Sequence, residues 1–233
     1  MITGKYKPNP ERTNPMKKHV PQVLLWGGLW GISEATVGYL AHLLLPGMGW
    51  AFYYPIAYGF MRISYSQTGK SRVVLYCAIL SAAIKLINLP MTPRPDYVIN
   101  PAVSIMLEGL AAYIAFRFIR EQSRPMIHYG LLPFATSALW RGLYLVYLLL
   151  APGWIREASI LFMPGMLFSF ATLELMGNGL VIALWTISVG MIMKKIKAPL
   201  KSRFSAGPGL FKRYMSILPI ASFCLAVLLQ WIF

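Results

Sequence analysis

The sequence predicts an all-α protein, a polytopic bundle of six to seven transmembrane helices in one domain. Of its 233 residues, 57% are hydrophobic and only 12% are charged, against about 25% charged in a typical soluble domain. The apolar residues also form runs of about 20, the length that a helix needs to cross the hydrocarbon core. Five ionisable residues interrupt these runs. So few charged side chains do not cover a surface facing water, and a membrane protein with a polar centre is expected.

The basic segments divide the chain. Residues 1–20 are expected to be a polar cytoplasmic tail, residues 21–193 a six-helix transmembrane core, residues 194–213 a basic cytoplasmic loop and residues 214–233 a C-terminal transmembrane helix. Seven spans are expected, at roughly 22–45, 48–65, 73–91, 98–116, 128–151, 160–193 and 214–232. The sixth is long enough to contain a break, and Pro164-Gly165 and the Gly-Asn-Gly run at 177–179 are the expected positions.

Lysine and arginine are distributed unevenly between the two sets of loops. The N-terminal tail and alternate loops hold nearly all of them, whereas the opposite loops hold only Arg94 and Arg156. Because basic loops remain in the cytoplasm, we expect a cytoplasmic N-terminus and a multi-pass protein of the plasma membrane. Seven spans place the C-terminus outside, and six leave both ends inside. The net charge of +15 therefore reflects topology and contact with membrane lipid, and no nucleic-acid partner is expected.

The five ionisable residues inside spans are the candidate site. They lie near mid-span, on helix faces that carry small or polar residues: Glu34, Lys85, Glu108, Arg141 and Glu174. Asn88 lies near Lys85 in the sequence, and Asn178 lies near Glu174. A lone charge at this depth costs on the order of 3 kcal/mol or more, so the five must converge, pair or face water. Three acids and two bases leave one carboxyl without a partner, and this carboxyl is expected either to be protonated at neutral pH or to bind a cation.

Three functions fit this pattern. The first is binding of a small polar solute by the five charges with Asn88 and Asn178. The second is a non-catalytic assembly or interaction subunit, in which the buried ion pairs only fix helix packing. The third is an intramembrane enzyme with Glu34 and Glu108 as acid and base. We expect transport of a solute and no enzymatic activity.

Two segments resemble each other. Residues 34–41 and 108–115 share the order acid, small residue, two residues, small residue, tyrosine, aliphatic residue and alanine. The first predicted span runs outward and the fourth inward, so a duplication here is an inverted repeat, as in many transporters. The alternative is a chance match between alanine-rich helices.

Two further patterns, a phosphate-binding motif and metal-binding histidines, do not fit the sequence. Thr68 to Ser71 reads TGKS, but a phosphate-binding loop needs a glycine where Ser64 stands. The histidines have no cysteine or histidine partner at metal-ligand spacing. No metal or cofactor is expected.

Gly27, Gly31 and Ala35 stand four residues apart in the first span, which is followed by the runs 54–61, 68–70 and 84–87. The four-residue spacing resembles the first helix of the substrate-binding S components of energy-coupling-factor (ECF) vitamin transporters, and the three runs are similar to the passage through the second and third helices of that family. The resemblance implies a site for a vitamin or similar micronutrient. It also implies that Gly27, Gly31 and Ala35 pack against a transmembrane coupling subunit, and that cytoplasmic ATPases drive transport.

Overall fold

The computed structural model describes residues 17–38, 40, 50–118, 131–157, 159–185, 188 and 208–232. Most of the tail 1–20, Tyr39 and most of the basic loop 194–213 lie outside these residues, so expectations for them stay predictions. Every regular element in the described residues is helical, and no strand occurs among them. The predicted all-α class is confirmed.

Each predicted span contains described helix, in whole or in part. In chain order the helices are α1 (Val20–Ser33) with a π-helical turn (Glu34–Gly38), α3 (Trp50–Thr68), α4 (Ser71–Leu86), α5 (Asp96–Phe118), α6 (Leu132–Leu150), α7 (Gly153–Glu157), α8 (Met166–Ala171) and α10 (Pro208–Ile232). Short 3-10 turns occupy Lys17–His19, Leu89–Met91 and Ile160–Phe162. Residues 173–185 are also helical.

Four of the described helices are long and apolar enough to cross a membrane. They cover Ser71–Met91, Asp96–Phe118, Leu132–Leu150 and Met166–Trp185, and α10 contributes a shorter apolar stretch, Ile217–Gln230. α1 has only 14 residues before the π-helical turn, and α3 carries Arg62 together with several hydroxyl side chains, which lowers its hydropathy. The four helices indicate a membrane protein.

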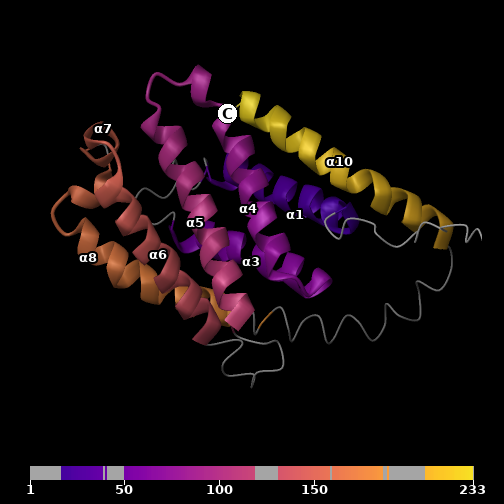
Figure 1. The fold of residues 1–233 in the computed structure, drawn as a ribbon, viewed down its shortest axis with the longest axis horizontal. Coiled ribbons are helices and arrows are strands. Elements are labelled where there is room, and N and C mark those ends of the chain that lie inside the picture. Colours follow the sequence, from indigo (N-terminus) through magenta and orange to yellow (C-terminus); the bar gives the residue numbers. More distant parts are fainter. Residues whose placement is uncertain are drawn as a thin grey trace, which may run out of the picture.

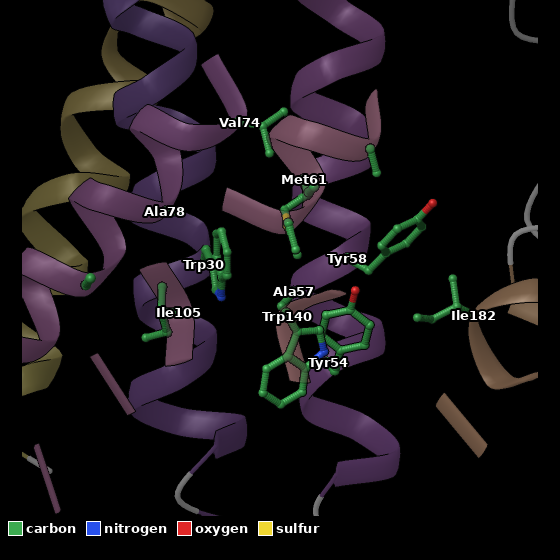
Figure 2. Packing of buried hydrophobic residues seen from close by; sticks show 14 of the residues in the cluster. Trp30, Tyr54, Ala57, Tyr58, Met61, Val74, Ala78, Ile105, Trp140 and Ile182 are labelled. Atoms are coloured by element: carbon green, nitrogen blue, oxygen red, sulfur yellow. The ribbon is translucent and has the colours of Figure 1, made fainter. Parts of the chain in front are cut away.

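The bundle is arranged around α4 and α5, which pack closely on each other. α1 lies between α4 and α10 on one side, and α6 covers α5 on the other, followed by α8 (Figure 1). A side chain at Gly109 would overlap Ala78, so glycine is what allows α5 to approach α4 this closely. Large aromatic residues fill the centre, among them Trp30, Tyr54 and Trp140 (Figure 2).

The sixth predicted span is interrupted, but only partly where expected. Gly165 has a left-handed backbone (φ +78°) and precedes α8, as expected for the Pro164-Gly165 position. The second irregularity is a distortion at Thr172 (φ −120°, ψ −72°), which ends α8 inside the apolar stretch Met166–Trp185. The expected break at 177–179 is wrong, because these residues lie inside the helix 173–185. Gly179 instead allows close approach, since a side chain there would overlap Phe134.

Candidate functional site

Arg141 is the most enclosed of the five charges, with 2% of its surface exposed. Its Nε donates to the Phe170 carbonyl at 3.0 Å, and Nη1 donates to Ser137 Oγ at 2.6 Å. Its Nη2 lies 3.7 Å from Glu174 Oε2. The guanidinium carbon also lies 4.6 Å from the Trp140 ring centroid and 5.1 Å from that of Phe170. Hydrogen bonds, an ion pair and cation–π contacts therefore hold this cation in place.

Glu108, on α5, is buried with much less compensation. Its Oε1 accepts a hydrogen bond from Ser104 Oγ at 3.2 Å. Its Oε2 is buried and has no hydrogen-bond partner in the described part of the chain. The carboxyl is close enough to interact electrostatically with Glu34, which repels it, and with Arg141, which attracts it. Glu108 is therefore the acid whose charge the described residues compensate least.

Glu34 begins the π-helical turn that follows α1. Trp30 lies four residues earlier, and its Nε1 donates to Glu34 Oε1 at 3.2 Å. Lys85, on α4, attracts Glu34 electrostatically, but the described residues form no ion pair between the two. π-helical turns are frequent at functional sites because they redirect side chains within a helix. The turn places Glu34 where it interacts with both Lys85 and Glu108.

The five charges thus form one electrostatically connected series, in the order Lys85, Glu34, Glu108, Arg141 and Glu174. The two ends of the series differ. Arg141 and Glu174 form an ion pair at 3.7 Å, whereas Lys85 and Glu34 do not come within salt-bridge distance among the described contacts.

Further buried polar atoms lie in the same core. Trp140 Nε1 and Ser81 Oγ have no hydrogen-bond partner within the described ranges. The Trp140 ring lies 5.5 Å from that of Tyr54 (Figure 2), and Tyr54 interacts electrostatically with both Glu108 and Arg141. A buried polar group without a partner costs about 1–3 kcal/mol. Such groups mark positions where water or a ligand supplies the missing hydrogen bond.

The two asparagines are placed differently. Asn178 is fully buried and follows Glu174 by one helical turn, so it lies on the same helix face. Asn88 follows the end of α4 and precedes the Leu89–Met91 turn. Its buried Oδ1 has no hydrogen-bond partner among the described residues. Its backbone N–H donates to the Lys85 carbonyl at 3.3 Å, but no described side-chain contact joins Asn88 to the five charges.

The small-residue stripe of α1 faces its own chain. A side chain at Gly27 would lie 3.0 Å from the Cys77 carbonyl of α4, and one at Gly31 would lie 3.2 Å from Ile84. Ala35, next on the stripe, is buried. The expectation that this stripe packs against a separate coupling subunit does not fit this arrangement, because α4 and α10 of the same chain already cover it.

The loop before α5 carries a separate ion pair. Arg94 donates to Asp96 through Nη2 at 2.8 Å and Nε at 3.3 Å, and its guanidinium stacks on Tyr97. The hydrogen bond and the charge of Asp96 raise the pKa of Arg94. Asp96 stands in the first turn of α5, where a negative charge stabilises the helix dipole. This pair fixes the start of α5 and lies outside the buried series.

Sequence reasoning missed the aromatic residues around the charges. Trp30 and Trp140 contact Glu34 and Arg141 directly, but neither was among the candidate site residues. The spacing from Trp30 to Glu34 is one helical turn, which places both on one face. That spacing is the signal that could have identified Trp30.

No family model matches this chain, and comparison with curated proteins and with solved structures gives no match either.

Proposed function

We propose that this chain is a multi-pass plasma-membrane transport protein that binds a small polar solute with a cationic group at Glu34 and Glu108. The supporting observation is Glu108 Oε2, a buried carboxylate oxygen with no hydrogen-bond partner in the described residues. A cationic donor on the solute supplies the missing bond and offsets the repulsion between the two acids. The contacts of the cationic group with Glu34 and with Glu108 are strong because water is excluded and the local dielectric constant is low.

The aromatic residues support a cationic group on the solute. Trp30 orients Glu34 through its hydrogen bond, and Tyr54 lies within electrostatic reach of Glu108. Ammonium groups bind favourably to the faces of tryptophan and tyrosine rings. Arg141 is already engaged by Glu174, Ser137 and the Phe170 carbonyl, so in this proposal it shapes the site and Glu108 contacts the solute.

In this proposal the chain has six to seven spans and a cytoplasmic N-terminus, and it functions as an S component does. Transport then needs a coupling subunit and cytoplasmic ATPases. Because α4 and α10 cover the Gly27 and Gly31 face of α1, such a subunit has to bind another face of the bundle.

The test is mass spectrometry of small molecules released from protein purified in mild detergent, comparing wild type with Glu108→Gln. Glu157→Gln is the matched control, because Glu157 is an exposed glutamate on α7. A hydrogen bond to a charged group contributes about 1.5–3 kcal/mol, so the variant should bind the released compound about 10- to 100-fold more weakly. The control should retain it.

Two results would overturn the proposal. One is equal retention of the compound by Glu108→Gln and wild type. The other is a wild-type protein that releases no compound and shows no thermal stabilisation with a panel of ammonium-bearing solutes.

A second function is supported by the other end of the charged series. Arg141 is fixed by the chain's own groups, with bonds to Ser137, Phe170 and Glu174. Such a pair is expected in an assembly subunit whose buried charges only hold helices together. This function predicts that Glu108→Gln lowers the yield of folded protein as severely as loss of Arg141 does.

A further inference from the structure

A groove lies at the end of the bundle where α4 begins, away from the buried charges. It encloses about 690 Å³, within the range of roughly 300–1,000 Å³ that is usual for ligand pockets. Its walls come from α1 and α4, and they are mainly apolar: Val20, Val23, Leu24, Val73, Tyr76 and Leu80. The groove therefore has the size and the lining of a site for an apolar ligand.

The mouth of the groove is basic. Three cationic side chains and one histidine line it. His19 comes from the turn before α1, Lys70 from the loop before α4, Arg72 from the first turn of α4 and Arg117 from the last turn of α5. No acidic side chain lines the groove among the described residues. Arg117 is oriented by a hydrogen bond from its Nη1 to the Tyr113 hydroxyl at 2.8 Å. Residues from three separate parts of the chain thus place positive charge at one opening.

The start of α4 adds backbone donors at the same position. Lys70 precedes the helix, and no side chain in the described residues caps its first turn. The first N–H groups of an uncapped helix point at its N-terminal end, where an anion is favoured. Gly69 has a φ of +62°, which lets the chain turn sharply into α4 and brings Lys70 and Arg72 to the groove.

The groove follows a candidate membrane-spanning helix. From Ser71 at its mouth to Leu80 it extends about 13 Å along α4, at 1.5 Å per residue. The helix belongs to the stretch Ser71–Met91, which is apolar enough to cross a membrane. A soluble phosphate compound needs the basic mouth but not this apolar length. An anionic phospholipid uses both, because its phosphate faces the basic residues while an acyl chain extends along α1 and α4.

We propose that this groove binds one anionic phospholipid, with its phosphate at Lys70, Arg72, Arg117 and the start of α4. The chain's own segment 1–16 is a poor occupant, because it carries Lys5, Lys7 and Arg12 against a single acid, Glu11, and the mouth repels its net positive charge. The site is separate from the proposed solute site and does not depend on it. It places the lipid at the end of the bundle that the positive-inside pattern assigns to the cytoplasm.

The test uses the full chain in detergent, with native mass spectrometry and thermal unfolding in the presence of added lipid. Phosphatidylglycerol should remain bound and raise the Tm, whereas phosphatidylcholine should do neither. Each basic residue near an anionic headgroup contributes measurably to binding, so Arg72→Ala with Arg117→Ala should weaken phosphatidylglycerol binding at least tenfold. Arg156→Ala, an exposed arginine on α7, should leave it within twofold of wild type.

A second variant tests the apolar wall independently. Val20 is 46% exposed at the groove, so Val20→Trp should fill the groove, keep the fold and displace the lipid while every basic residue remains. Equal binding of the two lipids would overturn the proposal, as would undiminished phosphatidylglycerol binding in both variants. Glycerol phosphate that displaces the lipid at equal concentration would also overturn it, because the groove would then recognise only a soluble phosphate.

Discussion

Replacing Arg141 by methionine is the sharpest test of how the buried charges are held. The substitution keeps much of the side-chain volume but removes the bonds to Ser137 and the Phe170 carbonyl and leaves Glu174 without its cation. Breaking one side of a buried ion pair costs about 3–5 kcal/mol. Because 14% of the Glu174 side chain is exposed, the protein does not fully enclose that carboxyl group. We therefore expect Arg141→Met to lower the free energy of unfolding by about 3 kcal/mol, the lower end of that range.

Glu174→Gln should cost less, about 1–2 kcal/mol, because Arg141 keeps its other hydrogen bonds and its aromatic contacts. In the double variant the carboxylate is no longer left unpaired. The double variant should therefore lose less free energy of unfolding than the two single variants together, by at least about 1 kcal/mol, a coupling usual for residues in one network.

The assay is equilibrium unfolding of the purified protein in mixed micelles, with Arg156→Met as an exposed control that should change stability by less than about 0.5 kcal/mol. Additive losses in the double variant would refute the inference that the two side chains stabilise each other. A loss below about 1 kcal/mol for Arg141→Met would show that the buried bonds contribute little.

Two more predictions concern helix packing and the orientation of Glu34. Gly109→Ala should destabilise the protein by about 1–3 kcal/mol, because its methyl group overlaps Ala78. Gly142→Ala, where no atom lies within 4 Å in the described residues, should stabilise it by up to about 1 kcal/mol through helix propensity; unfolding curves that rank the two alike would contradict this. Trp30→Phe removes the hydrogen bond to Glu34 but keeps most of the packing, so solute binding should weaken about tenfold at nearly unchanged stability. Unaltered binding in that variant would mean that Trp30 does not orient Glu34.

The helices were predictable because their signals are local. Apolar runs of membrane-spanning length set α4, α5 and α6, and the helix class follows from composition. The break at Pro164-Gly165 was also predictable, since Gly165 takes a left-handed backbone. The break at Thr172 was not, because threonines are common in helices; in the structure its hydroxyl donates to the Phe168 carbonyl at 2.6 Å, a contact that often bends helices. Gly177 and Gly179 looked like helix breakers, but Gly179 serves close packing against Phe134.

The arrangement of the charges was predictable only in part. Their shared depth follows from their positions in the apolar runs, but which acid lacks a partner depends on how the helices pack. Glu108 differs from Glu174 because Arg141 turns toward Glu174. The packing partner of Gly27 and Gly31 was not predictable either, because a small-residue stripe has the same sequence pattern whether it packs against its own chain or another subunit.

Glu108 and the Arg141–Glu174 pair should respond differently to mutation, and this difference separates the two proposed functions. Arg141 and Glu174 are satisfied by the chain, so their loss should reduce stability. Glu108 has an oxygen that no described residue satisfies, so converting it to glutamine breaks no hydrogen bond at that oxygen and should cost little stability. A folded Glu108→Gln protein that has lost its solute would support transport. A misfolded one would mean that Glu108 serves helix packing as Arg141 does, and the series would then be a structural network throughout.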